Sequence, residues 1–117
     1  MGLRDPARSQ RRNASYVEFI TGEGGVIDTW LRRGAAGFRL DVADELPDEF
    51  IEKVRTAVKR VGPDKFLLGE VWEDATTKFG FDKRRTYLLG KGLDSVMNYP
   101  FRTPFWALSA DGTPARP

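Results

Sequence analysis

Two short stretches of sequence decide the fold, GFRLDV (residues 37–42) and FLLGEVW (residues 66–72). Each is an apolar run with an acidic residue near its end, Asp41 in the first and Glu70 in the second. A carboxylate at the end of a buried strand loses hydration, which costs free energy. Its presence there therefore indicates a chemical role. Two such carboxylates in succession therefore indicate a functional pair.

The interval between these carboxylates predicts a repeated strand–helix unit. Asp41 and Glu70 are 29 residues apart, and a (β/α)8 barrel of ~250 residues advances about 31 residues per unit. A third apolar run, SVMNY (95–99), follows at nearly the same interval. We therefore predict an α/β fold that forms part of a (β/α)8 TIM barrel, about three units and roughly half of the barrel.

The first run alternates in polarity, with Phe38, Leu40 and Val42 on one side and Arg39 and Asp41 on the other. In a barrel strand the apolar side packs outward on helices. The polar side then lies inside, toward the C-terminal end where barrel enzymes have their active sites. The alternative is a half-exposed strand that carries a salt bridge.

The second run is nearly all apolar until Glu70, which is typical of a parallel strand buried on both faces. Glu70 forms a carboxylate pair with Asp41 of the first run, and glycoside hydrolases use such pairs to cleave glycosidic bonds. The two runs together therefore indicate glycosidic bond cleavage. Trp72 lies on the same side of the pleat as Glu70 and has two interpretations. A ring in the core is the preferred one, and a platform for a sugar is the other.

Four helices are expected around these strands. A capping box of Ser15 and Glu18 opens the first, which ends at Gly22, and the second covers residues 26–33. Pro47 begins the third, whose apolar stripe extends to Val61. A short amphipathic helix is expected within residues 80–89. The predicted organisation is a flexible basic arm (1–14), a partial catalytic domain (15–108) and a frayed tail (109–117), with Phe101, Phe105 and Trp106 as an unfinished partner surface.

Composition excludes several functions. The 19 basic and 17 acidic residues give a net charge of +2, too small to indicate a nucleic-acid partner. Cysteine and histidine are absent, which removes thiol nucleophiles, imidazole bases and His- or Cys-ligated metals. We expect no metal and no cofactor. No apolar run is long enough to span a bilayer, so we expect no membrane partner and a cytoplasmic location.

Three segments resemble the α-amylase superfamily, glycoside hydrolase family 13. GFRLDVADE (37–45) is similar to its nucleophile motif, and LGEVW (68–72) is similar to its acid/base motif. DSVMNYPF (94–101) is most similar to the branch of neopullulanases, cyclomaltodextrinases and maltogenic amylases. The likeness extends from about residue 15 to residue 105.

The resemblance implies a retaining hydrolase of α-1,4 or α-1,6 bonds in starch-like glucans. Asp41 would be the nucleophile and Glu70 the acid/base, with Arg39 holding Asp41 ionised. Desolvation among apolar neighbours is expected to raise the pKa of Glu70. The residues expected to bind substrate are Arg39, Asp44, Glu45 and Trp72.

The chain also departs from the family pattern. It has no histidine, so it contains neither the upstream Asn-His motif nor the downstream His-Asp motif, whose aspartate is the third carboxylate. Asp44-Glu45 replaces the Lys-His pair of many amylases, which leaves a family calcium site unsupported. Two functions therefore stay open. One is a hydrolase completed by a homo-oligomer or a complementing chain, and the other is a noncatalytic remnant or sugar-binding module.

Overall fold

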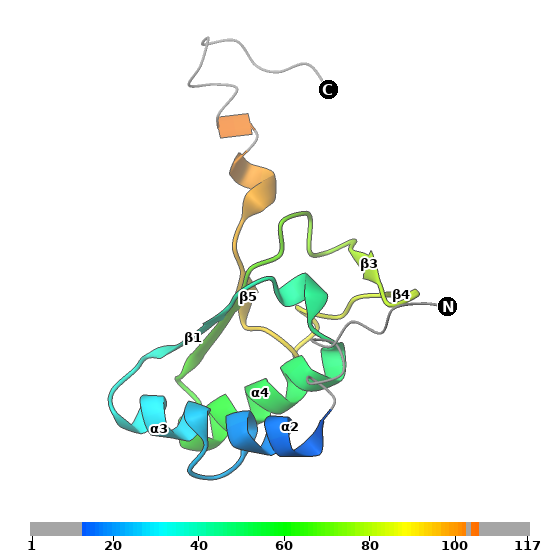
Figure 1. Cartoon of the computed structure of the whole chain (residues 1–117). Coiled ribbons are helices and arrows are strands. Elements are labelled where there is room, and N and C mark those ends of the chain that lie inside the picture. The colour runs from blue at the N-terminus through cyan, green and yellow to red at the C-terminus, as the bar shows by residue number, and fades with distance from the viewer. Residues whose placement is uncertain (1–12, 103, 106–117) are drawn as a thin grey trace.

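The computed structural model describes residues 13–102, 104 and 105 of the chain. Residues 1–12 of the predicted arm, Trp106 and the predicted tail lie outside these residues. In the described part, no helix is long and apolar enough to cross a membrane. The elements, in chain order (Figure 1), are α2 (Ala14–Thr21), α3 (Val26–Arg32), β1 (Gly37–Leu40), η1 (Ala43–Glu45), α4 (Asp48–Val61), β2 (Phe66–Gly69), β3 (Phe79–Gly80), β4 (Lys83–Arg84) and β5 (Ser95–Val96).

Strands β1, β2 and β5 form a parallel sheet in the order β1-β2-β5. The register of the first pair runs from Gly37 opposite Phe66 to Leu40 opposite Gly69. The two backbones approach so closely that a side chain at Gly37 would run into the carbonyl oxygen of Phe66, which explains the glycine. The parallel strands predicted from the spacing of the apolar runs are thus confirmed.

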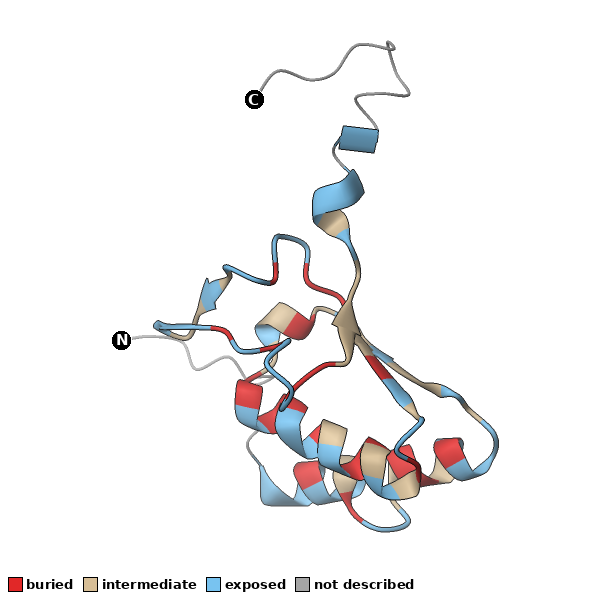
Figure 2. Ribbon diagram, turned by 180° about the vertical axis from the view of Figure 1, so that it is seen from behind, coloured by how far each residue is buried: buried red, intermediate tan, exposed pale blue. Residues whose placement is uncertain are grey.

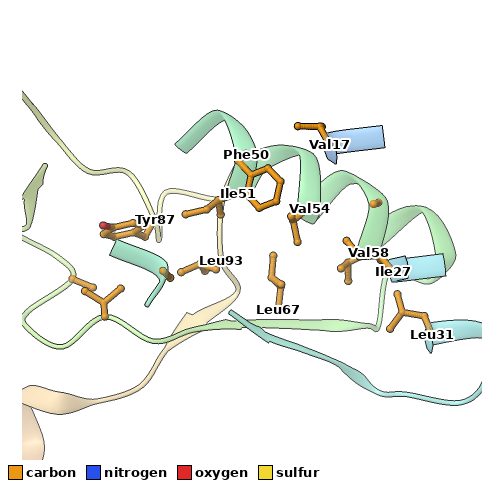
Figure 3. Packing of buried hydrophobic residues seen from close by; sticks show 14 residues of the cluster. Val17, Ile27, Leu31, Phe50, Ile51, Val54, Val58, Leu67, Tyr87 and Leu93 are labelled. Carbon is orange, nitrogen blue, oxygen red and sulfur yellow. The ribbon is translucent and has the colours of Figure 1, made fainter. Parts of the chain in front are cut away.

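Helix α4 connects β1 to β2 and supplies more of the buried core than any other described element. Its predicted apolar stripe faces the sheet and packs on Leu67, which is fully buried (Figure 3). Burying an aliphatic or aromatic side chain of this kind contributes roughly 1.5–3 kcal/mol, so this stripe holds the helix on the strands. Its buried apolar members are Phe50, Ile51, Val54, Ala57 and Val58.

The helices α2, α3 and α4 lie together on one side of the sheet (Figure 2), and α2 packs on α3 and α4. Phe38 and Leu40 pack against the core on this side, as the alternation in β1 predicted. Arg39 lies on the other side and is exposed. The predicted burial of β2 on both faces is wrong, because Phe66 is 47% exposed. Among the described elements, only one face of the sheet is covered by helices.

The expected helix within residues 80–89 is also wrong. Strands β3 and β4 pair antiparallel with Gly80 opposite Lys83, so residues 81 and 82 form a two-residue turn. Both Phe81 and Asp82 have positive φ, which such a tight hairpin turn requires. A tertiary contact explains the difference, since the neighbouring Arg85 is buried and donates to Asp48 on α4 at 2.8 Å.

The first helix begins earlier than the capping box predicted. Asn13 is the N-cap of α2, and its side chain accepts a hydrogen bond from the backbone N–H of Ser15 at 3.1 Å. Asparagine is as good an N-cap as serine, and it comes first in the chain. The predicted end at Gly22 is confirmed, as is the helix α3.

Candidate active site

The chain turns sharply after β1, and this turn presents Asp41. The Oδ1 atom of Asp41 accepts a hydrogen bond from Nη1 of Arg39 at 2.9 Å. The Asp41 side chain is 73% exposed, whereas that of Arg39 is 44% exposed. Arg39 therefore orients an acceptor that is open to solvent. A salt bridge on a partly exposed strand fits both interpretations of the first run, so the role of Asp41 stays a prediction.

Glu70 follows β2 directly and is held by three donors. Its Oε1 atom accepts from Nη2 of Arg39 at 2.7 Å and from the hydroxyl of Tyr99 at 3.1 Å. Its Oε2 atom accepts from the backbone N–H of Val42 at 3.1 Å. Only 10% of the Glu70 side chain is exposed, so these donors replace the water that burial removes.

The backbone of Val42 is unusual for a β-branched residue. Its φ of 46° and ψ of 49° place it in the left-handed region, which valine rarely adopts. This conformation directs its N–H toward Glu70, and the next N–H, that of Ala43, donates to the carbonyl oxygen of Glu70 at 2.8 Å. A strained residue that positions a carboxylate is typical of functional sites.

Protonation at Glu70 differs from the sequence prediction. The N–H of Val42 is the largest cause that lowers the pKa of Glu70 below its ordinary value, and it acts against burial. The side chains of Tyr99, Trp72 and Asp41 lower the pKa further. The prediction of a raised pKa is therefore wrong for this structure, because apolar neighbours in the sequence did not show these donors.

Arg39 is the group shared by both carboxylates. The hydrogen bond to Asp41 is the largest cause that raises the pKa of Arg39, and Glu70 raises it as well. The guanidinium therefore stays charged and draws the ends of β1 and β2 together. Two carboxyl groups thus lie at the ends of adjacent parallel strands and share one cation, and a carboxyl pair can serve as nucleophile and proton donor in displacement at a sugar carbon.

The other predicted substrate-binding residues lie at different places. Trp72 is 61% exposed, so the preferred interpretation of a core ring is wrong, and its effect on the pKa of Glu70 places it beside that carboxylate. Asp44 is directed toward Lys78, whose Nζ lies 3.4 Å from its Oδ2. Glu45 is exposed on η1. The structure thus brings Arg39 and Trp72 to the carboxylate pair, while Asp44 takes part in an ion pair instead.

Tyr99 and Val42 are site residues that the sequence reasoning missed. A signal for Tyr99 was present, because it follows Glu70 by 29 residues, the same interval that separates Asp41 from Glu70. The places are not equivalent in the sheet, however, because Asp41 and Glu70 come one residue after their strands and Tyr99 comes three residues after β5. Val42 carried no such signal, since its contribution comes from the backbone.

A parallel strand–helix sheet with a carboxylate at the end of each of two adjacent strands is compatible with the catalytic domain of a barrel glycoside hydrolase. Residues 11–115 match the alpha-amylase catalytic domain. The chain belongs to this family and represents part of its TIM barrel.

Curated relatives agree with this assignment. Neopullulanase 2 of Thermoactinomyces vulgaris is 41% identical over 73 residues, covering 62% of this chain and 11% of that protein. A cyclomaltodextrinase of Thermoanaerobacter pseudethanolicus is 41% identical over 66% of this chain and 12% of its own length. The intracellular maltogenic amylase of Bacillus subtilis is 36% identical over 72% of this chain and 13% of its own length. These relatives are a neopullulanase, a cyclomaltodextrinase and a maltogenic amylase, the branch that the motifs predicted.

A solved structure shares the same arrangement. The cyclic α-maltosyl-(1→6)-maltose hydrolase of Arthrobacter globiformis, in complex with its named sugar, superposes with a TM-score of 0.71 at 27% identity. The match covers 86% of this chain and 20% of that chain. The chain therefore spans about a fifth or less of the length of the proteins it resembles.

Proposed function

We propose that this chain is the nucleophile and acid/base portion of a retaining glycoside hydrolase that acts on α-1,4 or α-1,6 bonds of starch-like glucans. The observation that supports it most directly is the bridge from Arg39 to both Asp41 and Glu70, at 2.9 and 2.7 Å. Relatives named as neopullulanase and cyclomaltodextrinase support the substrate class.

In this proposal Asp41 attacks the anomeric carbon and forms a glycosyl ester, while the bond to the leaving oxygen breaks. Glu70 gives its proton to that oxygen. Glu70 then takes a proton from water, which attacks the ester and releases Asp41 as a carboxylate. The exposure of Asp41 suits attack on a bound sugar, and Trp72 offers an aromatic face beside it.

Glu70 must carry a proton before the first step, although its present donors lower its pKa. Two changes favour the protonated form when a glucan binds. The sugar excludes water from the carboxyl, and attack by Asp41 requires that Arg39 support the nucleophile rather than Glu70. The lowered pKa of Glu70 therefore describes the site without a glucan, and Glu70 acts as an acid when a glucan is bound.

The chain lacks the third carboxylate that the family resemblance implies, because it contains no histidine and hence no His-Asp motif. Turnover in this proposal then requires further strand–helix units beyond these 117 residues. A noncatalytic sugar-binding module is the second candidate. The exposed ring of Trp72 beside buried Glu70 supports it, since aromatic faces and carboxylates bind sugars without cleaving them.

The test places this chain in a barrel completed with the remaining units of neopullulanase 2. Asp41→Ala should reduce hydrolysis of maltooligosaccharides by about 10⁴-fold or more, because no nucleophile is left. Asp64→Ala, at an exposed position after α4, is the matched control and should retain activity. Near-normal hydrolysis by Asp41→Ala would exclude the nucleophile assignment. Binding without turnover in the parent chimera would favour the second candidate.

A further inference from the structure

Tyr99 is the contact to Glu70 that comes from the third strand of the sheet. It follows β5, and its hydroxyl lies 3.1 Å from Oε1 of Glu70. Its backbone N–H donates to the carbonyl oxygen of Met97 at 2.9 Å, and the sulfur of Met97 accepts from Nε of Arg39 at 3.3 Å. One short segment thus contacts both Glu70 and the guanidinium that bridges the carboxylates.

The three donors around Glu70 differ in what they can do when the carboxylate gains a proton. The guanidinium of Arg39 and the N–H of Val42 can only donate, so each hydrogen bond weakens if the oxygen that accepts it gains a proton. The hydroxyl of Tyr99 can donate to a carboxylate or accept from a carboxylic acid by rotating about its C–O bond. Of the two groups on Oε1, Arg39 and Tyr99, only the hydroxyl can stay bonded when that oxygen carries the proton, while Oε2 still accepts from Val42.

We propose that Tyr99 is a positioning residue that holds Oε1 of Glu70 in both protonation states by reversing the direction of their hydrogen bond. The proposal rests on the proposed function, in which Glu70 gives and takes a proton. Tyr99 is half-buried, three residues past β5, where its backbone bond to Met97 and its hydroxyl contact with Glu70 hold it. An open hollow of about 230 Å³, lined by Met97, Asn98, Tyr99 and Arg102, lies beside it and leaves the ring accessible from one side.

Charged groups around the pair come from each neighbouring segment. Arg39 and Asp41 face Glu70 from β1 and its turn, and Arg102 is near Tyr99 from the helical residues that follow it. Burial is the largest cause that raises the pKa of Tyr99, and the contact with Glu70 raises it further. The phenol therefore keeps its proton over the range in which Glu70 titrates.

The test measures titration in the full 117-residue chain rather than activity. Glutamate labelled with ¹³C at the carboxyl reports each side chain as pH changes, and Glu70→Gln assigns the resonance of Glu70. In Tyr99→Phe, we expect the Glu70 midpoint to move upward, because the bond donated to the anion is stronger than the bond accepted from the neutral acid, so the anion loses more. Tyr16→Phe is the matched control. It also removes a hydroxyl, but its ring lies on α2 and stacks on Phe50.

An unchanged Glu70 midpoint in folded Tyr99→Phe would overturn the proposal, as would an equal shift of all glutamates, which indicates a general structural effect. The reciprocal measurement does not depend on that variant. The ¹³Cζ titration of Tyr99 should move downward in Glu70→Gln, because the neighbouring anion is gone, and no movement there would also overturn the proposal. If the completed barrel has no turnover, the proposed function fails while both titrations keep their outcome, so the two failures are distinguishable.

Discussion

Arg39 on β1 reaches Glu70 at the end of β2, with its Nη2 2.7 Å from Oε1 of Glu70. Its Nη1 lies 2.9 Å from Oδ1 of Asp41, in the turn that follows β1. The same cation therefore contacts the residue proposed as the nucleophile and the residue proposed as the acid. In the proposed mechanism, a shift of Arg39 toward Asp41 accompanies the change from the open site to the reactive one. Both contacts favour the charged form of Arg39.

Glu70→Gln in the completed barrel should reduce hydrolysis of maltooligosaccharides much more than hydrolysis of aryl α-glucosides. An aryl leaving group departs without protonation, whereas a sugar hydroxyl needs it. Initial rates on the two substrate types provide the measurement. Equal losses on both would show that Glu70 has a structural role, in keeping with its three hydrogen bonds.

Much of the fold follows from local pattern. The alternation in β1 placed Arg39 and Asp41 on the face away from the helices, and the interval of 29 residues placed Glu70 after the next strand. Pro47 and the stripe of α4 gave the connecting helix. These features depend on backbone periodicity and burial, and both are present in a sequence.

The parts that were missed depend on contacts between distant residues. The reach of Arg39 to Glu70 follows from a register in which Arg39 lies opposite Leu68, two residues before Glu70, and sequence alone does not state a register. The hairpin β3–β4 replaced a helix because Arg85 is buried against Asp48, 37 residues away. Trp72 is exposed because the described helices cover the opposite face of the sheet.

Asp94 should make stability depend on acid pH. Burial would raise its pKa, but hydrogen bonds from Lys59, Arg55 and the N–H of Leu67 outweigh burial and lower the pKa from 3.8 to about 2. A lowered pKa in the folded state adds stability above about pH 4, and this stability is lost as pH falls toward 2. The contribution is on the order of 2 kcal/mol.

Urea unfolding between pH 7 and pH 2 provides the measurement for Asp94. Asp94→Asn should lower stability at pH 7 and flatten the decline between pH 4 and pH 2. Glu52→Gln changes an exposed carboxylate on α4 and should leave the decline as it is. An identical decline in Asp94→Asn and the unmodified chain would contradict the assignment.

Arg85 should be the residue that anchors the hairpin. Its side chain is fully buried, and it donates to the carboxylate of Asp48 and to the carbonyl oxygens of Asp44 and Leu46. Its guanidinium also lies 4.4 Å from the ring centre of Tyr87. Arg85→Met leaves a buried carboxylate without this partner, which should cost about 3–5 kcal/mol in the free energy of unfolding.

Chemical denaturation and amide hydrogen exchange in residues 79–87 would measure that loss. Arg84→Met is the matched control, since Arg84 is exposed on the same hairpin, and it should change stability by less than about 1 kcal/mol. Equal stability of the Arg84 and Arg85 variants would show that the buried cluster does not hold the hairpin.

The isolated chain should neither hydrolyse glucans at a useful rate nor stay monomeric. In the described sheet, β1 and β5 are both edge strands, and the face away from the helices exposes Phe66. Unpaired strand edges and exposed aromatic rings such as Phe101 and Phe105 favour association with other chains. The third carboxylate of the family pattern is missing as well, so association of identical copies does not supply it.

Light scattering of the purified 117-residue chain, together with assays on maltooligosaccharides, cyclodextrins and pullulan, tests both parts of this expectation. Phe66→Ser should lower the apparent mass, because it removes an apolar contact from the open face. Thr56→Ser, at an exposed position on α4, is a conservative control that should not lower it. A monodisperse monomer with robust turnover that is lost in Asp41→Ala would show that three strands and two carboxylates suffice. Catalysis would then not require the rest of the barrel, and Arg39 with Tyr99 would have to supply the support that the third carboxylate gives in the family.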